Sequence, residues 1–460
     1  MDRRKHIDSI KAQIFSSREF AALKDRLKEL GSGNVLVLRG VAGSLLAFIT
    51  AWIARGHDGH VLLVASDGER AEKLRDDCVL LAGEENVRFF GPRPHHANAQ
   101  QFDLTPALAQ IETLKTLTSG RKVLVVASPE SLAEKTPSPE AFKGSAMTLA
   151  EGSECHFENL LKRLEDDGFE RKEFVEGYGD YSVRGGIVDV YSYGGENPLR
   201  IEFWGNTIES IREFDAVSQR SIRQLDQAGL IPSLTRNTGE GGGSLGSSLF
   251  DYLGKGAIIL LDEPALIERE IADLVDEQGT VLLTYQDIVR RLGEFGLVVN
   301  GKFSAPLAAT VSHGPLPEID FSSSPQPLFN GSIKSLVETL QKLAREDYRI
   351  YLGCDTAEEA GRINELIEEA FTAPRDEAGD GIDQPSSSLP YPGAEVFTET
   401  FHSGFTYRPG KIAVFTEHEI FGRLKRRGIV TQRGRTFLIR RAYLKALVSE
   451  LSSGRPHRDV

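Results

Sequence analysis

Residues 176–221 read EGYGDYSVRGGIVDVYSYGGENPLRIEFWGNTIESIREFDAVSQRS, and they decide the fold of the middle of the chain. Apolar and polar residues alternate over residues 188–190 and 199–203, and more loosely over 208–214, with the two-residue period of half-buried strands. Glycine pairs and Gly205-Asn206 separate these runs and supply the backbone angles that tight turns require. The pattern predicts a three-stranded antiparallel meander.

Upstream of the meander, short apolar runs alternate with segments of helical periodicity. The runs expected to be strands are residues 34–39, 60–65, 87–90 and 122–127. The segments expected to be helices are residues 1–30, 45–55, 69–81 and 106–117. Strands that are apolar throughout are typical of a parallel sheet with helices on both faces. The sequence therefore predicts an α/β fold: a doubly wound parallel sheet, an inserted small antiparallel β/α domain, and a second, smaller α/β domain.

The turn after the first strand has the context of a phosphate-binding loop without its chemistry. A working loop, GxxxxGK[ST], holds phosphates on backbone N–H groups, a lysine and a metal-binding hydroxyl. The corresponding residues here are Gly40, Gly43, Ser44, Leu45, Leu46 and Ala47. Leu45 replaces the second glycine, Leu46 the lysine and Ala47 the hydroxyl residue. Because the cationic clamp for phosphoryl transfer is missing, we expect a non-hydrolytic fold relic with no catalytic residue and no bound cofactor.

Two later segments imitate nucleotide-binding elements. Residues 239–248, GEGGGSLGSS, follow no clear strand and contain no lysine, so a flexible linker is the favoured interpretation. Asp262 and Glu263 end an apolar run and resemble the acidic pair that holds Mg²⁺ and orients water in ATPases. Without a lysine-bearing loop opposite, we favour a strand end that leads into a helix over residues 266–276.

Composition limits the classes of function. The chain has 54 basic and 67 acidic residues, a net charge of −13, so any contact with nucleic acid must be a local patch. Cys78, Cys155 and Cys354 lie far apart and lack partners at metal-ligand spacing, which indicates reduced thiols and no metal site. No apolar run has the length of a signal peptide or a membrane span. We therefore expect a cytoplasmic protein that does not interact with membranes.

The run RGGIVDVYSYGGENPLRIEFWGNTIESIREFD, residues 184–215, resembles the second domain of the transcription-repair coupling factors (Mfd) and of their relative UvrB. The resemblance covers nearly all of residues 1–422 and includes GFTYRPGKIAVFTEHEIFG, residues 404–422. In these families the second domain docks on UvrA, the damage-recognition subunit of nucleotide excision repair. The resemblance implies an adaptor that recruits UvrA to damaged DNA at stalled RNA polymerase, with no ATP hydrolysis by this portion.

The same resemblance implies a division of the chain into parts. They are domain 1a with the degenerate loop (residues 1–128), an inserted UvrA-binding-type domain 2 (129–214), domain 1b (215–324), a small α/β domain 3 (325–422) and a basic tail (423–460). Full-length members continue into an RNA-polymerase-binding module and an ATP- and Mg²⁺-dependent DNA translocase, which these 460 residues lack. We expect a fragment that meets RNA polymerase only through those missing modules.

Two arginines are the predicted UvrA contacts. In UvrB an arginine stands thirteen positions before the arginine of the RG pair, and Arg171 and Arg184 reproduce that spacing. Ser182 stands where UvrB often carries a further arginine. The planar guanidinium suits this task because it pairs with a carboxylate through two hydrogen bonds. Tyr181 and Tyr191 are the predicted aromatic contacts, and Tyr191 fits a core position equally well.

Two other classes of protein stay open. The chain fits a P-loop ATPase or helicase-like DNA repair protein in the strand-turn-helix context of its loop, although the loop residues and the missing second motor domain disfavour this class. It also fits a DNA-binding module that acts through its basic tail, residues 423–460, because arginine and lysine dominate there. Nucleotide turnover would identify the first class, and a steep loss of DNA affinity with salt the second.

Overall fold

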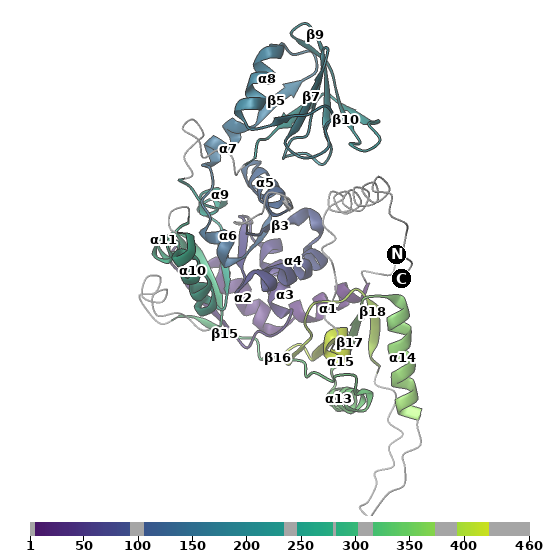
Figure 1. Cartoon of the computed structure of the whole chain (residues 1–460). Coiled ribbons are helices and arrows are strands. Elements are labelled where there is room, and N and C mark those ends of the chain that lie inside the picture. The colour runs from purple at the N-terminus through teal and green to yellow at the C-terminus, as the bar shows by residue number, and fades with distance from the viewer. Residues whose placement is uncertain are drawn as a thin grey trace, which may run out of the picture. The chain divides into compact units, whose positions relative to one another are not determined.

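The computed structural model describes residues 5–92, 105–233, 246–278, 282–301, 316–372 and 393–422. The chain divides into two compact units (Figure 1). The first unit comprises Met1–Arg93, Thr113–Thr136 and Leu245–Lys425. The second unit comprises Pro94–Glu112, Pro137–Ser244 and Arg426–Val460. The predicted basic tail lies outside the described residues, as does most of the predicted linker at 239–248.

A seven-stranded sheet forms the centre of the first unit. In order across the sheet its strands are β15 (Glu318–Asp320), β1 (Val35–Arg39), β14 (Gly296–Asn300), β13 (Ile258–Asp262), β2 (Val61–Val64), β4 (Leu124–Ala127) and β3 (Val87–Phe90). Each strand is parallel to its neighbours. Because its four residues are all buried, β2 must be covered on both faces. This sheet confirms the predicted α/β class.

Helices cover the seven-stranded sheet. The helical elements of this part are α1 (Lys5–Phe15), α2 (Arg18–Lys28), α3 (Leu45–Gly56), α4 (Gly68–Ala82), the short 3₁₀ helix η1 (Glu84–Asn86), α5 (Thr105–Thr118), α6 (Pro129–Ala133), α9 (Phe250–Leu253), α10 (Pro264–Gln278) and α11 (Tyr285–Leu292). The single helix predicted over residues 1–30 is two helices, with Ser17 as the N-cap residue of α2. Such a polar residue favours a helix start over continuation.

A second, five-stranded sheet belongs to the same unit. Its strands in order are β16 (Ser323–Pro325), β19 (Phe405–Tyr407), β20 (Ile412–Thr416), β17 (Arg349–Cys354) and β18 (Glu395–Thr398). Its helices are α13 (Ile333–Arg345), α14 (Ala357–Thr372) and α15 (Glu417–Phe421). One face of β17 and β20 packs on α13 and α14, through residues such as Ile350 and Phe415. The other face joins the core that contains α1 to α4.

Helix α3 connects these two layers of the first unit. Phe48 lies 4.9 Å from Phe401 and 5.7 Å from Phe405, measured between ring centroids. From α1, Ser9 Oγ lies 3.0 Å from the Tyr351 hydroxyl on β17. The small α/β part predicted at residues 325–422 therefore shares one apolar core with the first sheet.

An antiparallel sheet dominates the second unit. Its order is β11 (Ser221–Leu225), β10 (Thr207–Phe214), β9 (Leu199–Trp204), β8 (Ile187–Val190), β7 (Asp180–Arg184) and β6 (Glu170–Arg171). All neighbours are antiparallel except β6 and β7. A two-stranded ribbon, β5 (Met147–Ala150) with β12 (Gln227–Leu230), helices α7 (Pro139–Ser145) and α8 (Phe157–Asp166), and the N-terminal part of α5 also belong to this unit.

The predicted meander is present as β8, β9 and β10. The sheet is larger than the sequence indicates, because β6 and β7 precede the meander and β11 follows residue 214, where the insertion was expected to end. Four of the five residues of β11 are exposed, so this strand lacks the apolar alternation that identifies the others. Helix α8 lies beside the sheet (Figure 1). Its residues Leu160 and Leu164 belong to the core of the sheet. Among the described helices none combines the length and apolar character that crossing a membrane requires.

Replacing Leu46 of α3 tests the shared core. Leu46 is 1% exposed, so Leu46→Ala should lower the free energy of unfolding by about 2–5 kcal/mol. Leu328→Ala is the matched control because Leu328 is 59% exposed, and it should change the free energy by less than about 0.5 kcal/mol. Urea unfolding followed by Trp52 fluorescence, in a Trp204→Phe background, reports on the first unit. Equal losses in the two variants would contradict the buried position of Leu46.

Candidate functional site

Arg184 stands at the end of β7, next to the turn into β8. Its guanidinium donates a hydrogen bond to Asp189 on β8 and lies over the ring of Phe174, 5.6 Å from the centroid. The arginine side chain is still 44% exposed, whereas that of Asp189 is 1% exposed. The Arg184 guanidinium is therefore held by Asp189 and Phe174, and the rest of its surface is open to solvent.

Asp189 is a buried carboxylate that two arginines share. Arg200 on β9 donates from Nε to Oδ1 at 2.7 Å and from a terminal nitrogen to Oδ2 at 2.9 Å. The bond to Asp189 raises the pKa of Arg200 above its usual value. Arg200 also lies over the Phe214 ring, 4.6 Å from the centroid. A carboxylate removed from water is stable only when paired in this way, so Asp189 fixes the positions of both arginines.

Arg171 lies on the edge strand β6 and is exposed. In the register it stands opposite Tyr181, whereas Arg184 is three residues farther along β7. Successive side chains of a strand point to opposite faces, so Arg171 shares the face of Tyr181 and Arg184 lies on the other face. Arg171 and Arg184, thirteen residues apart, therefore lie on neighbouring strands at one edge of the sheet but on opposite faces of it.

Both predicted aromatic contacts are core residues. Tyr181 is 1% exposed, packs in the core under α8, and donates its hydroxyl proton to Glu165 Oε1 at 2.9 Å. Burial raises the pKa of the Tyr181 hydroxyl. Tyr191 is 4% exposed and donates to the Glu196 carbonyl oxygen at 2.8 Å. Burial raises its pKa as well. A contact role for these rings does not fit their burial, because a partner cannot reach them without opening the core.

Two other aromatic side chains are accessible. Phe174 is 46% exposed and lies beneath Arg184, and Trp204 at the end of β9 is 81% exposed. Ser182 is 1% exposed, so the position where UvrB often has an arginine is closed here. Phe174 was missed in the sequence because its neighbours, RKEF at residues 171–174, are charged and show no strand periodicity.

The turn from Gly40 to Ser44 is closed by a segment of the five-stranded sheet region. Ser44 N–H donates to the Ser403 carbonyl oxygen at 3.1 Å, and Ser403 N–H donates to Ser44 Oγ at 3.1 Å. Ser44 Oγ in turn donates to Asp77 Oδ2 at 2.6 Å. The hydroxyl next to the helix start is therefore fully engaged within the protein.

The neighbouring backbone groups of this turn are engaged too. Ala42 N–H donates to Ser323 Oγ at 2.8 Å, and Ser323 N–H donates to the Gly40 carbonyl oxygen at 2.8 Å. A Cβ atom at Gly43 would collide with the Gly404 carbonyl oxygen. Protein atoms thus occupy the space that faces Gly43, and the N–H groups of Ala42 and Ser44 already have acceptors.

The three residues that replace the phosphate-binding chemistry are buried. Leu45 and Ala47 are 0% exposed and Leu46 is 1% exposed. All three belong to the core that contains α1 to α4 and the inner face of the five-stranded sheet. They contribute apolar packing at the start of α3.

Asp262, the acidic residue at the end of β13, is paired within the protein. It accepts a hydrogen bond from Arg70 Nε at 3.0 Å and another from Asn300 Nδ2 at 2.8 Å. Arg70 also donates to the Gly43 carbonyl oxygen at 3.3 Å. A guanidinium therefore supplies the positive charge beside Asp262. No sequence pattern predicts this ion pair, because Arg70 and Asp262 lie far apart in the chain.

Comparison with known proteins gives two findings. Residues 147–235, which extend from β5 past β12, match the family model of the UvrB interaction domain. The chain is also similar to transcription-repair-coupling factors: it is 30% identical to that of Bacillus subtilis over 229 residues, which are 49% of this chain and 19% of that protein. It is 26% identical to that of Myxococcus xanthus over 502 aligned residues, 89% of this chain and 40% of that protein.

A third relative, the transcription-repair-coupling factor of Escherichia coli, is 24% identical over 204 residues, 44% of this chain and 18% of that protein. The chain spans less than half the length of these relatives. The resemblance predicted from the sequence is confirmed by these matches.

Neutralising the buried carboxylate tests the arginine pair. Asp189→Asn should destabilise the second unit by about 3–5 kcal/mol, because it leaves two guanidinium groups without their anion. Glu202→Gln is the control, since Glu202 has 26% side-chain exposure and also accepts from an arginine, Arg212. The loss of unfolding free energy in Glu202→Gln should stay at about 0–1 kcal/mol, as is typical of ion pairs that solvent can reach. Native-state hydrogen exchange of the backbone amides of β8 and β9 measures both, and an Asp189→Asn variant as stable as the wild type would contradict the pairing of Asp189 with the two arginines.

Proposed function

We propose that this chain, a relative of the transcription-repair-coupling factors, is an adaptor that binds UvrA and brings it to damaged DNA at stalled RNA polymerase. The observation that carries the proposal is the match of residues 147–235 to the UvrB interaction domain. The transcription-repair-coupling factor of Myxococcus xanthus is similar over 89% of this chain, which supports a role in the same repair process. In this proposal the adaptor works by binding alone, in the cytoplasm.

The anchored Arg184 is the centre of the proposed UvrA surface. Its guanidinium is held by Asp189 and rests on Phe174, so little side-chain freedom is lost when a partner binds. Its solvent-facing N–H groups suit a carboxylate of the partner. Arginine beside an accessible aromatic ring is a frequent composition of strong protein contacts. On the other face, Arg171 contributes only if UvrA also reaches around the edge strand β6.

We further propose that this portion does not hydrolyse ATP and does not bind it at the turn Gly40–Ser44. Three features support this: the core positions of Leu45, Leu46 and Ala47, the internal hydrogen bonds of Ser44, and the pairing of Asp262 with Arg70. Phosphoryl transfer depends on cations and N–H groups that are free to stabilise the transferred phosphate. Here the corresponding groups contact other parts of the chain.

Binding to purified UvrA tests the adaptor. Arg184→Ala should weaken binding by about 1–3 kcal/mol, and Arg171→Ala should do so if UvrA wraps around β6. Arg163→Ala on α8 is the matched control, because its side chain is 43% exposed and paired with Asp167, while that of Arg184 is 44% exposed and paired with Asp189. Calorimetry or surface-immobilised UvrA gives the affinities.

If wild-type protein binds UvrA and all three variants bind equally well, the surface lies elsewhere on the domain. If the wild type fails to bind although the second unit is folded, the adaptor proposal is wrong.

Nucleotide assays test the second proposal. The chain should release no phosphate from ATP above the rate of buffer, with or without Mg²⁺. The variant Leu46→Lys/Ala47→Ser, which restores two of the missing residue types, should also stay inactive, because position 46 is buried in the core and a lysine there has no exit to a phosphate. Turnover by the wild type would instead favour the ATPase class.

A further inference from the structure

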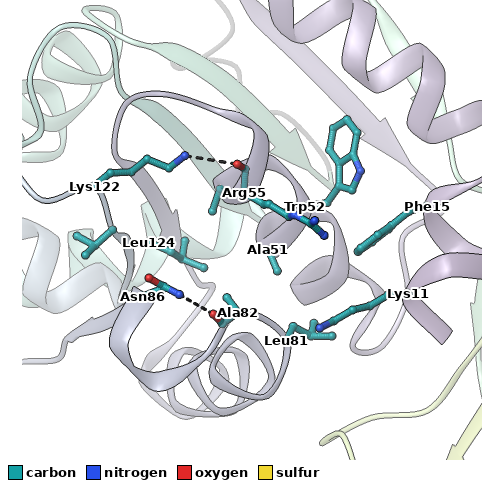
Figure 2. Close-up of a pocket in the computed structure, with 12 residues that line it drawn as sticks. Lys11, Phe15, Ala51, Trp52, Arg55, Leu81, Ala82, Asn86, Lys122 and Leu124 are labelled. Atoms are coloured by element: carbon teal, nitrogen blue, oxygen red, sulfur yellow. Dashed lines mark hydrogen bonds between the residues drawn. The ribbon is translucent and has the colours of Figure 1, made fainter. Parts of the chain in front are cut away.

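A cavity of about 370 Å³ lies in the first unit, beside the C-terminal end of α3 (Figure 2). Its walls come from α1, α3, the end of α4, η1 and the start of β4. The turn Gly40–Ser44 is at the opposite, N-terminal end of α3, so this cavity is separate from the closed phosphate-type loop. Its volume falls in the range of about 300–1,000 Å³ that is usual for small-molecule sites.

The walls of the cavity are mainly apolar and include two aromatic side chains. Phe15 and Trp52 line one side, and both are only partly buried. Ala51, Leu81 and Leu124 contribute aliphatic surface. Figure 2 shows the Arg55 side chain reaching toward Trp52 and Phe15. A flat apolar group is the shape that such a lining accommodates best.

The charged side chains that line the cavity, among the described residues, are cations. They are Lys11, Arg55 and Lys122, and none of the described lining residues is an aspartate or glutamate, although the whole chain carries a net charge of −13. Lys122 donates to the Arg55 carbonyl oxygen at 3.4 Å, and Lys11 forms an ion pair with Asp8 at 3.6 Å. A local excess of positive charge in a low-dielectric recess attracts and holds anions.

Arg55 differs from Lys11 and Lys122 in the contacts of its charged group. Within the residues that the structure describes, its guanidinium has no hydrogen-bond or ion-pair partner. Asn86, by contrast, donates to the Ala82 carbonyl oxygen at 2.8 Å and so caps α4. A guanidinium beside an aromatic wall offers paired N–H donors to a carboxylate, sulfonate or phosphate group.

We propose that this cavity binds a small organic anion with a flat apolar body, its ring against Trp52 and Phe15 and its charged group on Arg55. This site is independent of the proposed UvrA surface, because every lining residue belongs to the first unit and the UvrA surface belongs to the second. Lys11 and Lys122 add long-range attraction, and Arg55 supplies the directional contact.

The two tryptophans make the site measurable. The chain contains two, Trp52 and Trp204, so Trp204→Phe leaves Trp52 as the sole tryptophan, in the cavity wall. Anilinonaphthalene sulfonate, a flat fluorescent anion, is the probe. Its binding should quench Trp52 by energy transfer with saturable, one-site behaviour. Its uncharged analogue phenylnaphthylamine should bind at least about tenfold more weakly, because it lacks the group that Arg55 pairs with.

Two variants and one control locate the probe. Arg55→Ala should weaken binding about tenfold or more, and Ala54→Leu should block it by filling the cavity, which Ala54 lines. Arg345→Ala is the matched control, since Arg345 is likewise an exposed arginine in the last turn of a helix of the first unit, and it should bind like the parent. All proteins carry Trp204→Phe, and their unfolding curves verify that they are folded.

Competition defines the ligand class. Naphthalene sulfonate should displace the probe, whereas inorganic phosphate at the same concentration should not, because phosphate has no apolar body. Displacement by phosphate would show recognition of charge alone and overturn the proposed ligand class. Unchanged energy transfer in both Arg55→Ala and Ala54→Leu would place the probe elsewhere and overturn the site.

Discussion

Helix α3 is buried between two sheets, and the rest of the first unit depends on this constraint. Its residues Leu45 to Ala51 are all buried, so the helix must be apolar around its whole circumference. Its N-terminal end meets the segment at Ser403, which closes the turn before it. At its C-terminal end, Trp52 and Arg55 line a cavity. One packing requirement thus closes one end of the helix and leaves the other end accessible.

In the second unit the main constraint is the fixed position of an exposed arginine, Arg184, on a small sheet. A lone arginine on a strand moves among many rotamers and loses that freedom on binding. The buried Asp189 removes this cost beforehand, because it fixes Arg184 from below while Arg200 supplies the second positive charge. The carboxylate in turn depends on both arginines, since one alone leaves part of its hydrogen-bonding capacity unmet. The exposed Arg184, the buried Asp189 and Arg200 therefore depend on one another for their positions.

The fold was largely predictable from the sequence, and the side-chain arrangement was not. Apolar runs at residues 34–39 and 60–65 identify parallel strands because burial on both faces leaves a continuous signal. The strand β11 has no such signal, since most of its residues face solvent. Tyr181 was predicted to be an aromatic UvrA contact, and only the structure, with its register against Val190 and its burial, shows that it points into the core. Pairings such as Ser44 with Ser403 join residues too far apart for spacing rules to reach.

The burial of Leu45, Leu46 and Ala47 also bears on how such a loop changes over evolutionary time. Once apolar side chains fill the start of α3, a single return to lysine at position 46 would place a charge in a core where Leu46 is now 1% exposed. A return to glycine at position 45 would open a void and loosen the helix. Each of these single substitutions lowers the stability of the fold before any contact with phosphate can form. Core packing therefore opposes each single substitution that would bring phosphate-binding residue types to positions 45 and 46.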